Sequence, residues 1–259
     1  MDYWTQSNEN VFVAAHRGWN DRYAENTMEA FRAAADLGVD QIETDVRLTK
    51  DGELVLFHDE TLERVTDGSG KVIDHTLTEL KKLRVKGAGR IPTLIELLDM
   101  FGDYPELTLD MELKEYPTEG REPLAYQTCD RVLQLLSDAG LKDRCVINTW
   151  SGKLHEYIHQ TYGQKYKQHV YYPQRCLGPC TVDPYSYAYC TCVFGVQEGE
   201  ITIEDVQDLH RQTGVRIWAG TYAKDESSVE IAVRMGAELI TCNNPDEVLC
   251  ILRKNKLHR

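Results

Sequence analysis

The sequence predicts a closed α/β barrel of eight parallel strands with interposed helices, and three observations support this fold class. Short runs rich in β-branched and aromatic residues alternate with helical patterns almost from end to end. Eight such strand signals occur, which is the number that closes a TIM barrel. Barrels of about this length commonly form a single domain, so we expect one domain over residues 1–259. An open doubly wound sheet would show the same alternation and stays an alternative.

The predicted elements follow one another in a regular order. We expect strands at residues 11–16, 41–46, 107–113, 145–150, 169–173, 191–196, 215–219 and 238–242. We expect helices at residues 26–38, 91–101, 122–140, 152–162, 202–214, 227–237 and 245–255. In the first of these helices, Asn26 or Thr27 is the expected N-cap residue.

Residues 53–58 read as a further strand that does not belong to the parallel set. Only a few residues around Asp51 and Gly52 separate it from the strand at 41–46, whereas a parallel crossover needs about a dozen residues. We therefore expect a β-hairpin extension after strand 2. Pairing back along this hairpin places His58 opposite Glu43, Thr44 or Asp45.

Composition limits the classes of partner. The chain has 29 basic and 42 acidic residues and a net charge of -13, which disfavours non-specific nucleic-acid binding. No apolar run approaches the roughly 20 residues that cross a membrane, so we expect no stable membrane insertion. The first residues lack a basic segment followed by an apolar one, and we expect a cytoplasmic protein.

The cysteines and one long loop stand apart from the regular pattern. Residues 171–190 form a Cys-, Tyr- and Pro-rich segment, unlike a short βα loop, that we expect either to select a headgroup or to cover the barrel rim. Four of the eight cysteines, Cys176, Cys180, Cys190 and Cys192, lie within 17 residues. Their spacing is not the common paired zinc pattern, so reduced thiols are favoured over a zinc site or disulfides.

Acidic residues gather at the predicted carboxyl ends of the strands, where barrel enzymes place their chemistry. Glu43 and Asp45 share one face of strand 2, and Glu112 ends strand 3. Three converging carboxylates repel one another unless protons or a cation intervene, and oxygen ligands suit Mg²⁺ or Ca²⁺. Pairing of each acid with a neighbouring base on a solvated rim is the alternative.

Histidines and bases end the same strands. His16 and His58 form a pair in which one side chain can act as base while the other acts as acid. Arg17 and Lys114 supply fixed positive charge that suits phosphate oxygens, although both can simply pair with the nearby acids. Glu25 is expected to orient Arg17 or to contact the metal or substrate. Trp150 and Trp218 end strands and are expected to line the substrate pocket or to pack at its rim.

These motifs together resemble the glycerophosphodiester phosphodiesterase family. The markers are "HRG" (16–18), "ENT" (25–27), "ETD" (43–45), "HD" (58–59), "TDGSGKV" (66–72), "IPTLIELL" (91–98) and "MELK" (111–114), which occur in order. The resemblance implies hydrolysis of a glycerol-linked phosphodiester to sn-glycerol 3-phosphate and an alcohol. It also implies His16 and His58 as the acid/base pair, Glu43, Asp45 and Glu112 as ligands of one Mg²⁺ or Ca²⁺ ion, and Arg17 and Lys114 as phosphate contacts.

The second half departs from this family's pattern, for example in the run from Thr241 to Pro245. The candidate metal ligands and histidines are untouched, so the departure concerns substrate recognition. Two other functions stay open at this point. The same site would serve hydrolysis of lysophospholipids if an apolar groove adjoined it. A protein that binds glycerophosphodiesters without turnover is the other alternative, but the intact His16 and His58 argue against it.

Overall fold

A computed structural model describes residues 3–4, 10–86, 89–220 and 223–258. Within these residues, eight parallel strands close into a barrel, since β1 pairs with both β2 and β9. The barrel strands are β1 (Phe12–His16), β2 (Gln41–Leu48), β4 (Thr108–Leu113), β5 (Cys145–Asn148), β6 (Lys167–Tyr172), β7 (Cys190–Val193), β8 (Arg216–Ala219) and β9 (Leu239–Cys242). The prediction of a closed barrel is thereby confirmed.

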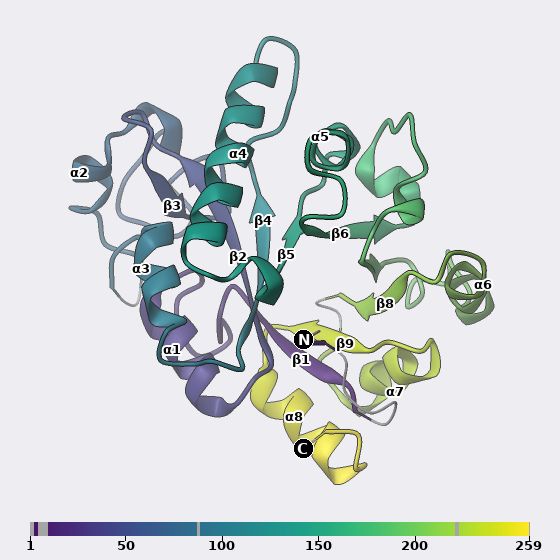
Figure 1. The fold of residues 1–259 in the computed structure, drawn as a ribbon. Helices are drawn as coiled ribbons and strands as arrows, with labels where there is room; N and C mark the ends of the chain where they lie inside the picture. Colours follow the sequence, from purple (N-terminus) through teal and green to yellow (C-terminus); the bar gives the residue numbers. More distant parts are fainter. Residues whose placement is uncertain (1–2, 5–9, 87–88, 221–222, 259) are drawn as a thin grey trace.

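Helices surround the barrel (Figure 1). They are α1 (Met28–Leu37), α2 (Leu77–Leu80), α3 (Leu94–Met100), α4 (Glu122–Asp138), α5 (Gly152–Tyr162), α6 (Ile203–Thr213), α7 (Glu226–Arg234) and α8 (Pro245–Lys254). Local signals explain their starts: Thr27 caps α1, and Thr93 and Glu96 form a capping box at α3. No helix in the described part of the chain has both the length and the apolar composition that a membrane span requires.

The expected hairpin is present, with β3 (Leu54–Leu56) antiparallel to β2. Its register pairs Val46 with Leu56, and the Phe57 amide still donates to the Asp45 carbonyl at 3.0 Å. Continuing this pairing by one residue sets His58 opposite Thr44, one of the three partners expected. The segment that follows packs on a small core of its own, which comprises Val55, Phe57, Leu62, Val72, Leu80, Val85 and Ile91.

The bottom of the barrel is filled by aromatic and aliphatic side chains. Trp4 and Trp218 are 1% and 0% exposed, and their ring centroids lie 6.3 Å apart. The other buried members of this cluster are Phe12, Ala14, Val146, Cys190 and Leu239. Trp218 therefore does not line the substrate pocket, contrary to the expectation. Its side chain lies in the buried cluster with Trp4, below the layer of carboxylates and histidines. The position of Trp218 near a strand end does not tell from the sequence which of these two layers its side chain occupies.

The segment 171–190 packs against α5. It contains two short 3₁₀ helices, η3 (Gln174–Leu177) and η4 (Pro184–Ser186), and the Tyr187 ring stacks on His159 at 4.2 Å. All eight cysteines are free thiols. Among the described residues, Cys176, Cys180, Cys190 and Cys192 form no cluster suited to a metal ion.

Candidate active site

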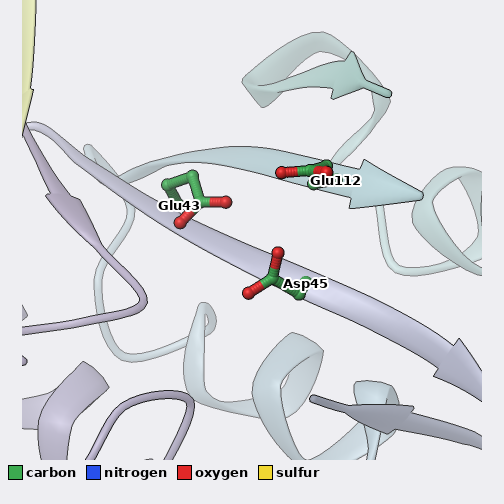
Figure 2. Close-up of side chains that lie close together, drawn as sticks. All are labelled: Glu43, Asp45 and Glu112. Atoms are coloured by element: carbon green, nitrogen blue, oxygen red, sulfur yellow. The ribbon is translucent and has the colours of Figure 1, made fainter. Parts of the chain in front are cut away.

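Three buried carboxylates meet where the middle of β2 lies beside the carboxyl end of β4. Strand alternation sets Glu43 and Asp45 on the same face of β2, and the sheet register pairs Asp45 with Glu112. One ligand atom from each of the three lies within 4.8 Å of the other two. Figure 2 shows the three side chains close together. The expected convergence of these acids is therefore observed.

Neighbouring basic side chains compensate the negative charge of Asp45 more fully than that of Glu43. Burial and the carboxylates of Asp45 and Glu112 raise the pKa of Glu43 well above its usual value. Burial also acts to raise the pKa of Asp45, but Lys114 and Arg17 outweigh it and lower that pKa. A divalent cation would relieve the repulsion that Glu43 experiences, and three carboxylates form an oxygen donor set that fits Mg²⁺ or Ca²⁺.

Lys114 lies with the carboxylates and not at the surface of the cavity. Its ammonium contacts Asp45 Oδ1 at 3.0 Å and also pairs with Glu112. The residue is 6% exposed and is absent from the cavity lining. The structure thus supports the alternative of ion pairing for Lys114 and offers no support for a direct phosphate contact.

Arg17 is positioned by its backbone and by three acids. It has a left-handed conformation (φ 57°), and its amide donates to Glu43 Oε2 at 2.9 Å. Its guanidinium contacts Glu25 at 2.9 Å and Asp45 at 3.4 Å. Gly18 follows with φ 79°, and a Cβ there would lie 2.8 Å from the Ala30 backbone, so α1 packs directly on the turn.

The two histidines have one ring nitrogen engaged each. His16 Nδ1 lies 2.7 Å from Asn243 Oδ1, and His58 Nδ1 lies 2.7 Å from Asp59 Oδ1. His16 Nε2 lies 3.9 Å from Glu43 Oε2, which is beyond hydrogen-bond distance, so each ring keeps Nε2 for a substrate. Burial and the adjacent Arg17 charge lower the pKa of His16 to about 4, and burial lowers the pKa of His58.

A cavity of about 200 Å³ joins these groups. One wall is polar and contains His16, Arg17, Glu43, His58 and Glu112. The opposite wall contains Trp150, which is 38% exposed and stacks on Tyr171 with ring centroids 4.0 Å apart, and Phe194. Of the two tryptophans expected in the pocket, Trp150 lines it.

Comparison with known proteins agrees with this arrangement. Residues 16–247 match the model of the glycerophosphoryl diester phosphodiesterase family. The chain is also 31% identical over 257 residues to a glycerophosphodiester phosphodiesterase from Caldanaerobacter subterraneus subsp. tengcongensis, with 94% of this chain and 98% of that protein covered. The chain belongs to this phosphodiesterase family. Membership makes it an enzyme of the phosphoric diester hydrolase class.

Solved structures show the same fold. A structure from Silicibacter pomeroyi DSS-3 superimposes with a TM-score of 0.83 at 21% identity and covers 98% of this chain and 97% of its own. An Oleispira antarctica phosphodiesterase, solved with the product sn-glycerol-3-phosphate, has a TM-score of 0.79 at 23% identity and covers 93% of this chain and 96% of its own.

Glu25 supports this phosphodiesterase site from outside the main cavity. Its carboxylate accepts from Arg17, as one of the expectations for Glu25 required. It also accepts two hydrogen bonds at 2.7 Å from Arg64. The same Arg64 guanidinium binds Asp59, the partner of His58. Arg64 lies in a long connection without periodic pattern, so the sequence did not single it out.

Asn26 is a second supporting residue that the sequence did not assign to the site. Thr27 is the N-cap of α1, which leaves Asn26 for another role. The Asn26 amide donates to Asp45 Oδ2 at 2.8 Å and accepts from the Thr44 hydroxyl at 2.7 Å. Asn26 has a left-handed backbone (φ 53°). The signal in the sequence is the residue type, because asparagine tolerates that conformation better than most residues.

Proposed function

We propose that the chain hydrolyses glycerophosphodiesters to sn-glycerol 3-phosphate and an alcohol with the help of one bound Mg²⁺ or Ca²⁺ ion, and that residues 1–259 act as one catalytic domain. The observation that carries this proposal is the meeting of three buried carboxylates, two histidines and Arg17 at one cavity. The product bound in the Oleispira antarctica neighbour supports the same substrate class.

Glu43, Asp45 and Glu112 would hold the ion. When bound, the ion offsets the negative charge that grows on the phosphoryl oxygens. Arg17 lines the cavity and presents a fixed positive charge to the phosphate, while Glu25 and Asp45 hold its guanidinium in place. Lys114 acts on the carboxylates and lowers the pKa of Asp45, which keeps that ligand ionised.

The histidines divide the proton transfers. His16 is neutral because its pKa is lowered to about 4, so its Nε2 can take the proton from the attacking oxygen. His58 donates a proton to the leaving alkoxide; burial lowers its pKa, and the Asp59 carboxylate acts against that shift by favouring the imidazolium form. Asp59 is held in turn by Arg64, which makes Arg64 a positioning residue for His58.

The test is release of sn-glycerol 3-phosphate from glycerophosphoethanolamine and glycerophosphocholine, measured with a coupled dehydrogenase assay. The proposal predicts release from at least one of them. A purified, folded protein that releases product from neither would contradict it. Lysophospholipids would then be tested at the same site, and failure there as well would favour the binding-protein alternative.

A further inference from the structure

Three polar side chains lie beside the carboxylate cluster and take no part in the proposed mechanism. Asp110 precedes Glu112 by two residues on β4, so it occupies the next layer toward the bottom of the barrel. Asn148 on β5 pairs with Glu112, and His169 on β6 pairs with Asn148. All three line the same cavity, and we call them the acceptor cluster.

Each member of the acceptor cluster has a buried atom without a hydrogen-bond partner. Asp110, Asn148 and His169 are 0%, 3% and 3% exposed. Their orphaned atoms are Asp110 Oδ1, Asn148 Oδ1 and His169 Nε2. Buried polar atoms in native proteins are nearly always satisfied by protein, water or ligand. Three such atoms in one cavity therefore require a polar occupant.

The chemistry of these atoms defines the occupant. Asp110 Oδ2 lies 2.7 Å from His169 Nδ1, so these two atoms satisfy each other and leave Asp110 Oδ1 and His169 Nε2 without a partner. Asp110 Oδ1 and Asn148 Oδ1 are oxygen atoms that accept hydrogen bonds, and His169 Nε2 adds a third polar atom. The Thr241 hydroxyl, also orphaned and lining the cavity, can donate or accept.

We propose that the acceptor cluster binds a hydrogen-bond donor group of the substrate, either a hydroxyl or a primary ammonium group. This rests on the proposed function and narrows its substrate class. The cavity of about 200 Å³ holds a group the size of ethanolamine or glycerol beside the phosphate. A trimethylammonium group has no N–H bond and leaves the two oxygen acceptors, Asp110 Oδ1 and Asn148 Oδ1, unpaired.

The test compares glycerophosphoethanolamine with glycerophosphocholine in Asn148→Leu, which has similar volume and lacks the acceptor. We expect kcat/KM for glycerophosphoethanolamine to fall about 10-fold or more. If the cluster binds the ammonium arm, glycerophosphocholine turnover stays within about twofold of wild type; if it binds a glycerol hydroxyl, both substrates lose equally. Asn148→Ala serves as the second variant if Asn148→Leu fails to fold.

The matched control is Thr191→Val, which also removes a buried polar atom without a hydrogen-bond partner, at a residue that does not line the cavity. We expect it to leave kcat/KM unchanged. The proposal is overturned if both Asn148 variants keep wild-type kcat/KM on both substrates, because ordered water alone would then fill the cluster. Calorimetric binding of glycerophosphoethanolamine to wild type and Asn148→Leu, done in EDTA, gives a readout that does not depend on turnover. A wild-type protein that binds glycerophosphoethanolamine but does not hydrolyse it would contradict the proposed function and would leave the acceptor-cluster proposal standing.

Discussion

At the scale of single residues, His58 shows how the chain positions a reactive group. Asp59 holds Nδ1 of its ring at 2.7 Å, and Arg47 donates two hydrogen bonds, at 2.7 and 3.0 Å, to its carbonyl oxygen. The hairpin of β2 and β3 fixes the position of the His58 backbone. Ring and backbone are therefore both fixed, and Nε2 is left as the atom available to the substrate.

Replacing either histidine should remove proton transfer without disturbing the fold. We expect His58→Ala or His16→Ala to lower kcat by about 100-fold or more. His75→Ala is the control, because His75 lies on the same long connection but outside the cavity. Steady-state kinetics with circular dichroism checks the result, and a fully active His58→Ala protein would refute its assigned role.

Arg64→Lys tests the positioning role. A guanidinium can bind the carboxylates of Glu25 and Asp59 together, whereas a lysine ammonium cannot reproduce both forks. We expect kcat to fall about tenfold or more through misplacement of His58, with KM nearly unchanged because Arg64 does not line the cavity. The exposed Arg84, changed to lysine, is the control. Equal kcat values for Arg64→Lys and wild type would refute the positioning role.

At the scale of elements, α5 connects the barrel with the segment 171–190. Glu156 accepts the amides of Thr181 and Val182, and a Cβ on Gly152 would lie 2.9 Å from the Pro179 carbonyl oxygen. On its inner side, His155 contacts the Thr149 carbonyl and the Gln168 side chain. The long segment is therefore seated on a helix that is itself tied to β5 and β6.

His155 should make the fold sensitive to acid. Burial lowers its pKa to about 4, whereas an unfolded histidine titrates near 6.5. The unfolded chain therefore binds a proton first as pH falls, so stability is full above about pH 6.5 and declines toward pH 4. We expect protonation of His155 in the unfolded chain to lower the free energy of unfolding by about 2 kcal/mol between pH 7 and pH 5.

Urea unfolding of wild type and His155→Gln at both pH values measures this effect. The variant keeps hydrogen-bonding capacity but lacks the titrating ring, so its free energy of unfolding should change less over this interval. An identical pH dependence for the two proteins would show that His155 is not the titrating group.

At the scale of the whole molecule, the barrel separates stability from chemistry along its axis. The aromatic cluster around Trp4 and Trp218 fills the end where the strands begin. The carboxylates and histidines occupy the end where the strands finish, as barrel enzymes require. Substitutions at the two ends should therefore have different consequences.

Trp4→Ala should destabilise the fold and spare the chemistry. Trp4 is 1% exposed, and its removal should cost about 3–5 kcal/mol of unfolding free energy, with kcat of the folded protein unchanged. Trp150→Ala is the matched control, because Trp150 is 38% exposed on the cavity wall. It should change KM with little effect on stability, and the reverse pattern would contradict this separation.

Much of this organisation was predictable from the sequence. Alternation along β2 brought Glu43 and Asp45 to one face, and the short turn before β3 required a hairpin that returns His58. The same alternation applied to "LTLDMEL" would have found Asp110 beside Glu112. It did not distinguish depth, however, and so Trp218 was placed in the wrong layer.

Other parts of the site depend on contacts between distant segments. The Lys114 ammonium pairs with the carboxylates of Asp45 and Glu112. This pairing depends on side-chain packing that no sequence pattern encodes. Arg64 reaches Glu25 across 39 positions of the chain, and His169 reaches Asp110 across 59. Such pairings follow from the closed barrel and become visible only in three dimensions.

The central claim, metal-dependent phosphodiester hydrolysis at this cavity, is tested most directly by metal removal. Protein treated with EDTA and dialysed would be titrated with Mg²⁺ or Ca²⁺ while sn-glycerol 3-phosphate release and binding heat are followed together, with Glu112→Gln in parallel. We expect release to vanish on chelation and to return in step with the binding of a single ion, and both signals to be lost in Glu112→Gln. Full turnover by the metal-free protein would contradict the claim.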